Sequence, residues 1–418
     1  MENLNPFELA GRIGELALPA FSEISKPVLE EFELWFASKL PLSPKFADAP
    51  EMRCVQHLNL YWRRGYLKGV LMNMFSHCLP DDTSTPQTSC TAEMFFGSIN
   101  TRGDALAYPF FHKRDFCFVP ELMALLGGGS DSLSDKVHIF NEVLECQQIQ
   151  RSLIKFSNAT ADLRREYENG KDGITLKGNT LCYGANTAFA VATHPLDFKT
   201  FTQLNQAGFW DRFHTLQADI HDDLAIEIFT GSMNPTDEFF SKVADLIPQL
   251  KIANEELWKK RPLTVKLPPY KSVMLPILIK AKEYAKKWSK ELGASLGEII
   301  RLRIRGDMTR EVSAYKILNP EISDEDLIRW TVTRIPHFFE FALNPNIGSG
   351  STLNVKRREE CIQTIIQKFK GKRAERREIL DSMVKEGYNE STIGRALHEI
   401  NTRKLNKTED FGVYEINQ

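Results

Sequence analysis

The chain has 418 residues, of which 42% are hydrophobic and 26% charged, and its formal net charge is −2. This length accommodates two or three domains, and the balanced charge means that any signal for nucleic acid has to be local. No apolar run reaches the roughly 18 residues that span a membrane, and the acidic start lacks the features of a signal peptide. Seven scattered cysteines without a CxxC pair indicate free thiols in a reducing cytoplasm.

Residues 1–50 and 51–232 predict two kinds of structure. The first stretch reads as short helices, clearest in KPVLEEFELWFASKL at 26–40, before three prolines end the pattern. The second contains two β-prone runs, DFCFV (115–119) and CYGANTAFAVAT (182–193), with helical spacing between them. Such runs are typical of strands buried on both faces of a parallel sheet, so the alternation predicts an α/β core.

The C-terminal half predicts helices and then a small basic domain. Residues 233–345 lose the strand signal and are expected to be helical, and 346–355 have the Gly, Ser and Asn content of a linker. Residues 356–418 predict a winged helix-turn-helix, with three helical stretches and an alternating hairpin-like segment, KLNKTEDFGVYEIN (404–417). The alternative is a small helical cap with solvated charges.

Positive charge is concentrated in this last domain. Residues 356–407 contain fourteen Lys/Arg and eight Asp/Glu, a local net charge of +6. We therefore expect it to bind DNA through phosphates, and the polar face of its third helix offers Arg395 and Arg403 for this contact.

One short stretch has the layout of a phosphate-binding loop. LYWRRGYLKGVLMNMF (60–75) runs from an apolar stretch through Gly65 and Lys68 into an apolar helical pattern. Glycine lets backbone N–H groups approach phosphate oxygens, and a lysine can reach them. Alone this spacing is weak evidence, because glycine and lysine three apart occur by chance. Gly69 also stands where a Ser or Thr hydroxyl should hold Mg²⁺.

Four later segments strengthen the interpretation of residues 60–75 as a phosphate-binding loop. FCFVPEL (116–122) is a buried strand that ends in an acid, NEVLECQQI (141–149) is a helix that runs into a strand, VATHP (191–195) closes a strand, and WDRF (210–213) places an arginine before an aromatic ring. In this order the chain resembles the AAA+ module of the minichromosome maintenance (MCM) family, which are ring-forming ATP-dependent DNA helicases. The resemblance covers roughly residues 50–415 and lacks the family's large N-terminal domain, for which the first 50 residues are too short.

The resemblance implies a role for each matching residue. Lys68 corresponds to the lysine that reaches the β- and γ-phosphates, and Gly65 to the loop glycine. Glu121 matches the glutamate that activates the attacking water, and His194 stands at the sensor asparagine that orients this water. Arg212 matches the arginine finger, which acts on the nucleotide of a neighbouring subunit. A sensor arginine is expected from the helical lid, where the candidates are Arg301, Arg303, Arg305 and, in the best context, Arg310.

Both magnesium ligands of the family are missing. Gly69 lacks the hydroxyl, and Pro120 replaces the aspartate that holds the ion. Phosphoryl transfer depends on metal to neutralise charge on the phosphate oxygens, and Arg63 and Arg64 cannot reproduce octahedral coordination. We therefore expect ATP as a cofactor without a Mg²⁺ site, and hydrolysis that is lost or very slow.

A polar insert, NATADLRREYENGKDGITLKGN (158–179), lies where the family's DNA-contacting hairpin projects into the ring pore. Its NG and DG pairs are turn signals. It offers four basic residues for phosphate contacts: Arg164, Arg165, Lys171 and Lys177. A solvated surface loop is the alternative interpretation.

These motifs together predict an MCM-like DNA-binding protein of DNA replication or maintenance, in the cytoplasm or at the nucleoid. A homo-oligomeric ring, or association with another AAA+ protein, is expected because an arginine finger such as Arg212 has no use in a monomer. Two alternatives stay open: an active helicase with unconventional metal ligands, and a winged-helix transcriptional regulator with an α/β sensor. DIHDD (219–223) could suggest a metal site, but its acids are better explained as a helix cap.

Overall fold

The structure is a computed structural model, and contacts divide the chain into two units, residues 1–345 and 346–418. The residues that it describes are 5–17, 22–41, 45–46, 55–62, 67–85, 95–100, 102–127, 133–145, 148–152, 159–178, 180–196, 198–218, 241–263, 266–292, 302–343, 361–386, 388, 393–394, 396–397, 400 and 413–416. The predicted Gly65, the DIHDD segment, Arg301, Arg395 and Arg403 lie outside these residues.

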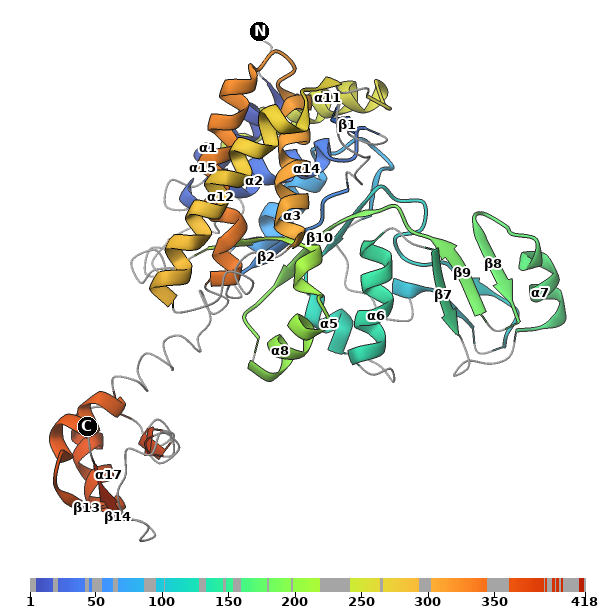
Figure 1. The fold of residues 1–418 in the computed structure, drawn as a ribbon. Coiled ribbons are helices and arrows are strands. Elements are labelled where there is room, and N and C mark those ends of the chain that lie inside the picture. The colour runs from blue at the N-terminus through green and yellow to red at the C-terminus, as the bar shows by residue number, and fades with distance from the viewer. Residues whose placement is uncertain are drawn as a thin grey trace. The chain divides into compact units, whose positions relative to one another are not determined.

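The first unit is built on a five-stranded sheet in which all neighbours are parallel (Figure 1). The strands, in spatial order, are β11 (His214–Gln217), β2 (Leu58–Tyr61), β10 (Ala188–Thr193), β6 (Phe116–Val119) and β3 (Ser84–Thr85). Tyr61 pairs with Thr193, and Val119 with Val191, so the carboxyl ends of the three central strands lie at one edge. The predicted α/β core with a parallel sheet is confirmed.

Successive residues of the central strands point to opposite faces, and both faces are covered. On one face Leu58, Leu60, Phe116 and Phe118 join a cluster with the N-terminal helices α1 (Pro6–Ala17) and α2 (Ser22–Ala37) and with α3 (Lys68–Ser76). The ring of Trp35 on α2 lies 4.9 Å from that of Phe116 and 5.4 Å from that of Phe118, centroid to centroid. The N-terminal helices are therefore part of the same unit as the sheet.

The other face carries a second cluster, in which Cys117, Val119, Phe189 and Val191 meet the helices that follow the strands. These helices are α5 (Leu122–Gly127), α6 (Leu133–Leu144) and α8 (Phe198–Gln206). Because each strand is buried on both sides, its sequence is a continuous apolar run rather than an alternation, which is the pattern that the sequence showed.

Residues 241–343 are mostly helical among those described, as predicted. The helices are α11 (Leu246–Lys259), α12 (Tyr270–Leu292), α14 (Leu302–Leu318) and α15 (Asp324–Leu343). Helices α12, α14 and α15 share a hydrophobic cluster, and α14 also packs on α2. A two-residue strand, β12 (Lys266–Leu267), pairs in parallel with β1 (Lys45–Phe46).

A small antiparallel sheet projects from the core on the side away from α1 and α15 (Figure 1). It contains β7 (Gln148–Ser152), β9 (Thr180–Gly184) and β8 (Ile174–Lys177), flanked by α7 (Ala161–Glu168). A further short hairpin, β4 (Ser98–Ile99) with β5 (Leu106–Ala107), precedes β6. The predicted turns are present, since Gly170 and Gly173 both have φ near +80 to +90°, a region open to glycine.

The interpretation of residues 182–193 as one strand was wrong. The run divides into β9 of the small sheet and β10 of the central sheet, separated by residues 185–187. Composition could not reveal the break, because Ala185, Asn186 and Thr187 are compatible with extended structure on both sides.

The second unit packs around its own cluster, in which Ile362, Ile379, Met383, Leu397 and Tyr414 are buried. Residues 361–369 are helical, followed by β13 (Arg373–Glu375), α17 (Arg376–Lys385) and β14 (Val413–Glu415). The expected C-terminal hairpin is seen only in part, because β14 pairs with β13, forty residues earlier, and 401–412 lie outside the described residues.

Candidate functional site

The strand order creates a switch in connection direction at the carboxyl edge of the central sheet. After β2 the next strand of this sheet along the chain is β3, at one side of the sheet. After β10 the next strand is β11, which lies beyond β2 at the opposite side. Neighbouring parallel strands whose connections diverge in this way form a topological switch point, where open α/β sheets bind ligands. Lys68 comes seven residues after the end of β2, and His194 directly follows β10.

Lys68 lies at the first position of α3 and is 9% exposed. Its Nζ donates a hydrogen bond to the carbonyl oxygen of Trp62 and lies 5.3 Å from the centroid of the Trp62 ring. The preceding Leu67 is in the left-handed region, with φ of 59°, and its side chain does not cap the helix. The N-terminal N–H groups of α3 are therefore not capped by that residue, and they carry the positive end of the helix dipole.

Glu121 and Pro120 follow β6 at the same edge. Glu121 is exposed, and its carbonyl oxygen accepts the N–H groups of Ala124 and Leu125 at the start of α5. Its carboxylate is therefore accessible to solvent. Pro120 brings no ligand oxygen in its side chain, so the edge of β6 contributes one carboxylate instead of two.

Gly69 is an exposed helical residue, and a Cβ built on it would meet no atom within 4 Å. A Ser or Thr would therefore fit at this position without displacing anything. Packing therefore does not explain why residue 69 lacks a hydroxyl-bearing side chain.

Arg212 belongs to a short 3-10 helix, η2 (Trp210–Arg212), directly before β11. Its Nη2 lies 2.5 Å from Glu145 Oε1, its Nη1 donates to the carbonyl oxygen of Gly208, and its side chain is 15% exposed. The expectation that this arginine has no use in a monomer was wrong, because it ties η2 to the end of α6. Reaching a neighbouring subunit would first require that ion pair to break.

Arg310 lies on α14 and is paired with Asp307 one turn earlier, with Nη1 2.6 Å from Oδ1. Its side chain is 25% exposed. Another candidate for the lid arginine, Arg305, also lies on α14, where its Nε donates to the Tyr270 hydroxyl at 2.6 Å. The structure thus places Arg305 and Arg310 on one helix, α14, and gives each a partner within the chain.

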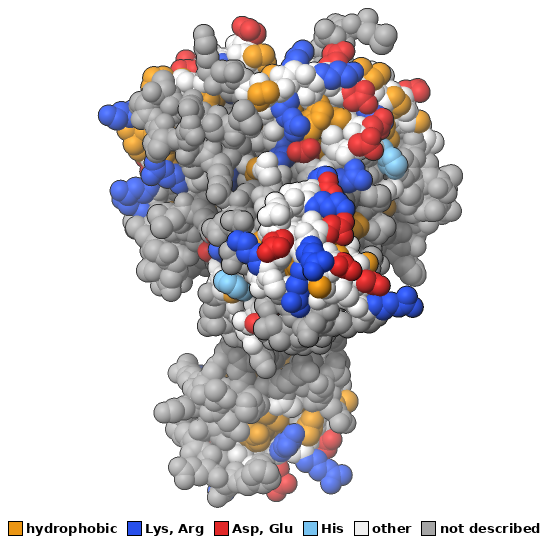
Figure 2. Space-filling view, turned by 90° about the vertical axis from the view of Figure 1, so that its right-hand side faces the viewer, with side chains coloured by type: hydrophobic (Ala, Val, Ile, Leu, Met, Phe, Trp, Pro, Cys, Tyr) orange, Lys and Arg blue, Asp and Glu red, His pale blue; other side chains and the backbone are white. Residues whose placement is uncertain are grey.

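The insert is balanced in charge, since its four basic residues stand beside four acidic ones: Asp162, Glu166, Glu168 and Asp172. Arg165 lies 3.7 Å from Asp162, Lys171 is hydrogen-bonded to Glu166, and Lys113 pairs with Asp172. Arg164 is partly exposed and Lys177 is exposed. Figure 2 looks onto this side and shows basic and acidic side chains interspersed over the described residues. The insert therefore carries no excess of positive charge.

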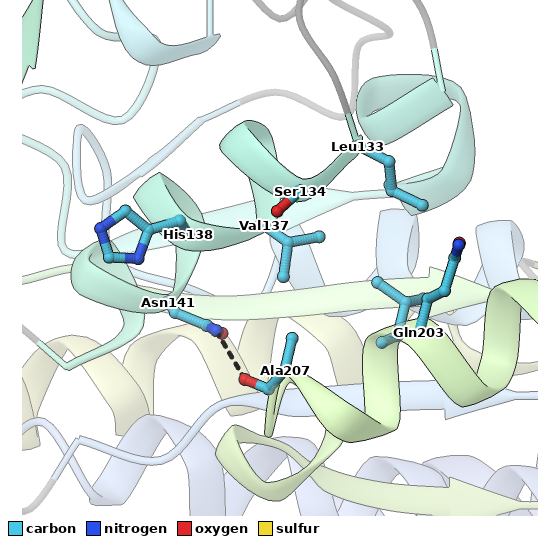
Figure 3. Close-up of a pocket in the computed structure, with 8 residues that line it drawn as sticks. Leu133, Ser134, Val137, His138, Asn141, Gln203 and Ala207 are labelled. Atoms are coloured by element: carbon cyan, nitrogen blue, oxygen red, sulfur yellow. Dashed lines mark hydrogen bonds between the residues drawn. The ribbon is translucent and has the colours of Figure 1, made fainter.

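A cavity of about 680 Å³ lies between α6 and α8 (Figure 3). Val137, His138, Asn141 and Gln203 are among its lining residues, and Asn141 donates to the carbonyl oxygen of Ala207 at 3.1 Å. Lys68, Glu121 and His194 do not line it.

Sequence reasoning missed two buried polar groups. Asn59 on β2 accepts from Thr193 on β10 at 2.8 Å and donates to Thr215 on β11 at 3.4 Å, which links three adjacent strands. The second group surrounds Glu31 and His214 in the interior. A polar residue inside an apolar run, as in LNLY (58–61), is the only local sequence signal that such a buried polar group exists.

Comparison with protein-family models and with curated proteins found no match. Over the described residues, no helix is both long and apolar enough to span a membrane.

Proposed function

We propose that this chain is an AAA+-type protein associated with DNA, in which Lys68 holds the phosphates of a nucleotide and ATP hydrolysis is slow or lost. The observation that carries this proposal is the switch point between β2 and β10. Lys68, Glu121 and His194 follow three central strands whose carboxyl ends lie at one edge. This arrangement supports the roles that the resemblance to the MCM family implies for them.

Phosphate binding is supported by the start of α3. A helix N-terminus presents N–H groups and a positive dipole to an anion, and an ammonium at the first helical position adds a full charge. The hydrogen bond from Lys68 to Trp62 holds the ammonium beside the end of β2. A bound phosphate would take over this donor, since a charge-assisted bond to phosphate is stronger than one to a neutral carbonyl.

Weak hydrolysis is supported by the missing oxygen ligands. Mg²⁺ demands near-octahedral oxygen coordination, and Gly69 and Pro120 supply no side-chain oxygen where two would be needed. Glu121 could still orient water, but developing charge on the phosphate oxygens would lack its metal.

Association with DNA is supported by the second unit. Its net charge of +6 over residues 356–407 suits phosphate contacts, and the pairing of β13 with β14 beside helical stretches is the arrangement that a winged helix would have. The insert supports DNA contact less strongly, because its charges are balanced and partly paired.

Titration of a fluorescent ATP analogue tests the phosphate site. We expect the full chain to bind it about equally with Mg²⁺ and with EDTA. Lys68→Ala should weaken binding at least about tenfold, which corresponds to about 1.4 kcal/mol. Lys282→Ala on the exposed side of α12 is the matched control and should bind like the wild type. Unchanged binding by Lys68→Ala would rule out the site.

Restoring the ligands tests the reason for weak hydrolysis. The double variant Gly69→Ser with Pro120→Asp should acquire Mg²⁺-dependent ATP turnover, and adding Glu121→Gln should abolish it. Turnover by the wild type that disappears in Glu121→Gln alone would instead show an active enzyme with unconventional metal ligands.

Salt-dependent binding to labelled DNA tests the second unit. We expect the full chain to prefer forked or single-stranded DNA, and Arg395→Ala with Arg403→Ala to weaken binding to all sequences alike. Tight binding to one duplex sequence by residues 346–418 would support a transcriptional regulator instead.

A further inference from the structure

Four charged side chains from four separate elements meet in the interior of the first unit. Glu31 comes from α2, His214 from β11, Glu311 from α14 and Arg334 from α15. The two glutamates have no exposed surface, His214 is 3% exposed and Arg334 is 8% exposed. Charged groups are buried in this way only when they are paired or bind a metal ion, so the balance of charge in the cluster has to be explained.

Arg334 occupies one oxygen of each carboxylate. Its Nε lies 2.8 Å from Glu311 Oε2, and its Nη2 donates to Glu31 Oε2. The other two oxygens face the imidazole: His214 Nε2 lies 3.5 Å from Glu31 Oε1 and 3.5 Å from Glu311 Oε1. These three atoms all lie within 4.8 Å of one another.

These spacings suit a metal ion. Zinc binds imidazole nitrogen and carboxylate oxygen at about 2.0–2.2 Å in tetrahedral geometry, which places neighbouring ligand atoms about 3.4 Å apart. The two distances of 3.5 Å from His214 therefore need almost no adjustment. Carboxylates that bind a metal commonly accept hydrogen bonds on their remaining oxygens, as Arg334 provides here.

Two of the three facing atoms lack any other partner. His214 Nε2 and Glu311 Oε1 are buried and make no hydrogen bond with the described residues. Glu31 Oε1 accepts one from Gln56 Nε2 at 3.2 Å. A buried polar atom without a partner is costly, so two such atoms beside a third atom, a carboxylate oxygen, suit a site for a cation.

The charges lead to the same conclusion. Two carboxylates face a single guanidinium. If both are ionised, the guanidinium balances only one of the two negative charges, and a cation bound between Glu31 and Glu311 would balance the other.

We propose that Glu31, His214 and Glu311 bind one divalent transition-metal ion of the zinc class, with Arg334 orienting both carboxylates. The mixed nitrogen and oxygen ligands favour such an ion over Mg²⁺, which prefers oxygen and retains its waters. The site joins the N-terminal helix α2 and the lid helices α14 and α15 to the strand that directly follows Arg212 and Phe213. It is independent of nucleotide binding at Lys68.

The full chain without an affinity tag, stripped with EDTA, reloaded with Zn²⁺ and gel-filtered, provides the test. We expect one equivalent of zinc by mass spectrometry, and near zero for His214→Gln and for Glu311→Gln under the same loading. His138→Gln is the control, because its side chain is 77% exposed and it should retain the full equivalent. Zinc retained by His214→Gln, or none bound by the folded wild type, would overturn the proposal.

X-ray absorption of the zinc-loaded wild type gives a result that does not depend on how the variants fold. We expect only nitrogen and oxygen neighbours at about 2.0–2.2 Å. Sulfur at about 2.3 Å would place the zinc on cysteines instead and would equally overturn the proposal.

Discussion

Replacing Glu33 by glutamine should stabilise the protein at alkaline pH. Glu33 on α2 has no exposed surface, its Oε2 accepts from Asn254 Nδ2 at 3.2 Å, and its Oε1 has no partner among the described residues. Burial raises the pKa of this carboxyl group from an ordinary 4.5 to about 8. The folded state therefore holds its proton more tightly than the unfolded state does.

The direction in which stability changes with pH follows from that difference in affinity for the proton. The contribution of Glu33 to stability is fully present below pH 4.5 and is lost as pH rises toward 8, because folding must then return a proton to a carboxylate that is ionised in the unfolded chain. A pKa difference of about 3.5 units corresponds to about 5 kcal/mol, an upper bound set by how far the site can relax.

Urea unfolding of the wild type and of Glu33→Gln between pH 5 and pH 8.5 measures this effect. All six tryptophans lie within residues 1–345, so their fluorescence reports the first unit alone. The advantage of the variant should grow by up to about 1.4 kcal/mol per pH unit and level off above pH 8. Glu256→Gln, exposed on α11, should show no such trend. A difference between Glu33→Gln and wild type that is the same at every pH would refute the reasoning.

Three further results are expected. Phe118→Ala removes a fully buried ring that contacts Phe32 and Trp35, so it should lower the free energy of unfolding by about 3–5 kcal/mol in urea titrations. Leu275→Ala, at an exposed position, should change this free energy by less than about 0.5 kcal/mol. Arg334→Met leaves Glu31 and Glu311 without their guanidinium and should lower the free energy of unfolding of the metal-free protein by about 3–5 kcal/mol. The loss should be larger at pH 8 than at pH 5, and equal losses at both pH values would contradict this. The control is Arg329→Met, at an exposed position, which should be nearly neutral. Residues 346–418 alone should unfold cooperatively by circular dichroism, because their buried cluster lies wholly within this unit, and a gradual thermal change would show that they need the rest of the chain.

Much of the fold was accessible from local patterns. The helix at 26–40, the buried strand at 115–119 and the helical character of 233–345 each follow from periodicity, which needs only neighbouring residues. The division of 182–193 between two sheets did not, because residues on both sides of the break favour extended structure and only their partners differ. The same holds for β14, whose partner β13 lies forty residues away.

The candidate site could be predicted in part from the sequence. The order of the motifs placed Lys68, Glu121 and His194 after strands, and the parallel sheet then put the ends of those strands at one edge. The pairing of Arg212 with Glu145 was not accessible, because a charged residue in a short motif gives no indication of which of 55 acidic side chains will meet it. That contact decides whether the arginine is available to a neighbouring subunit.

The sequence by itself determined the helix at 26–40, the strand at 115–119 and the helical character of 233–345, and it showed that Gly69 and Pro120 bring no side-chain oxygen, because these are properties of residue type at short spacing. Only the tertiary structure decided that Glu31, His214, Glu311 and Arg334 meet. They lie up to 303 positions apart, on four elements whose own patterns are ordinary. The chain brings them together because burying the apolar faces of α2, α14, α15 and β11 leaves these charged side chains no route to water, so they must neutralise one another or a bound ion.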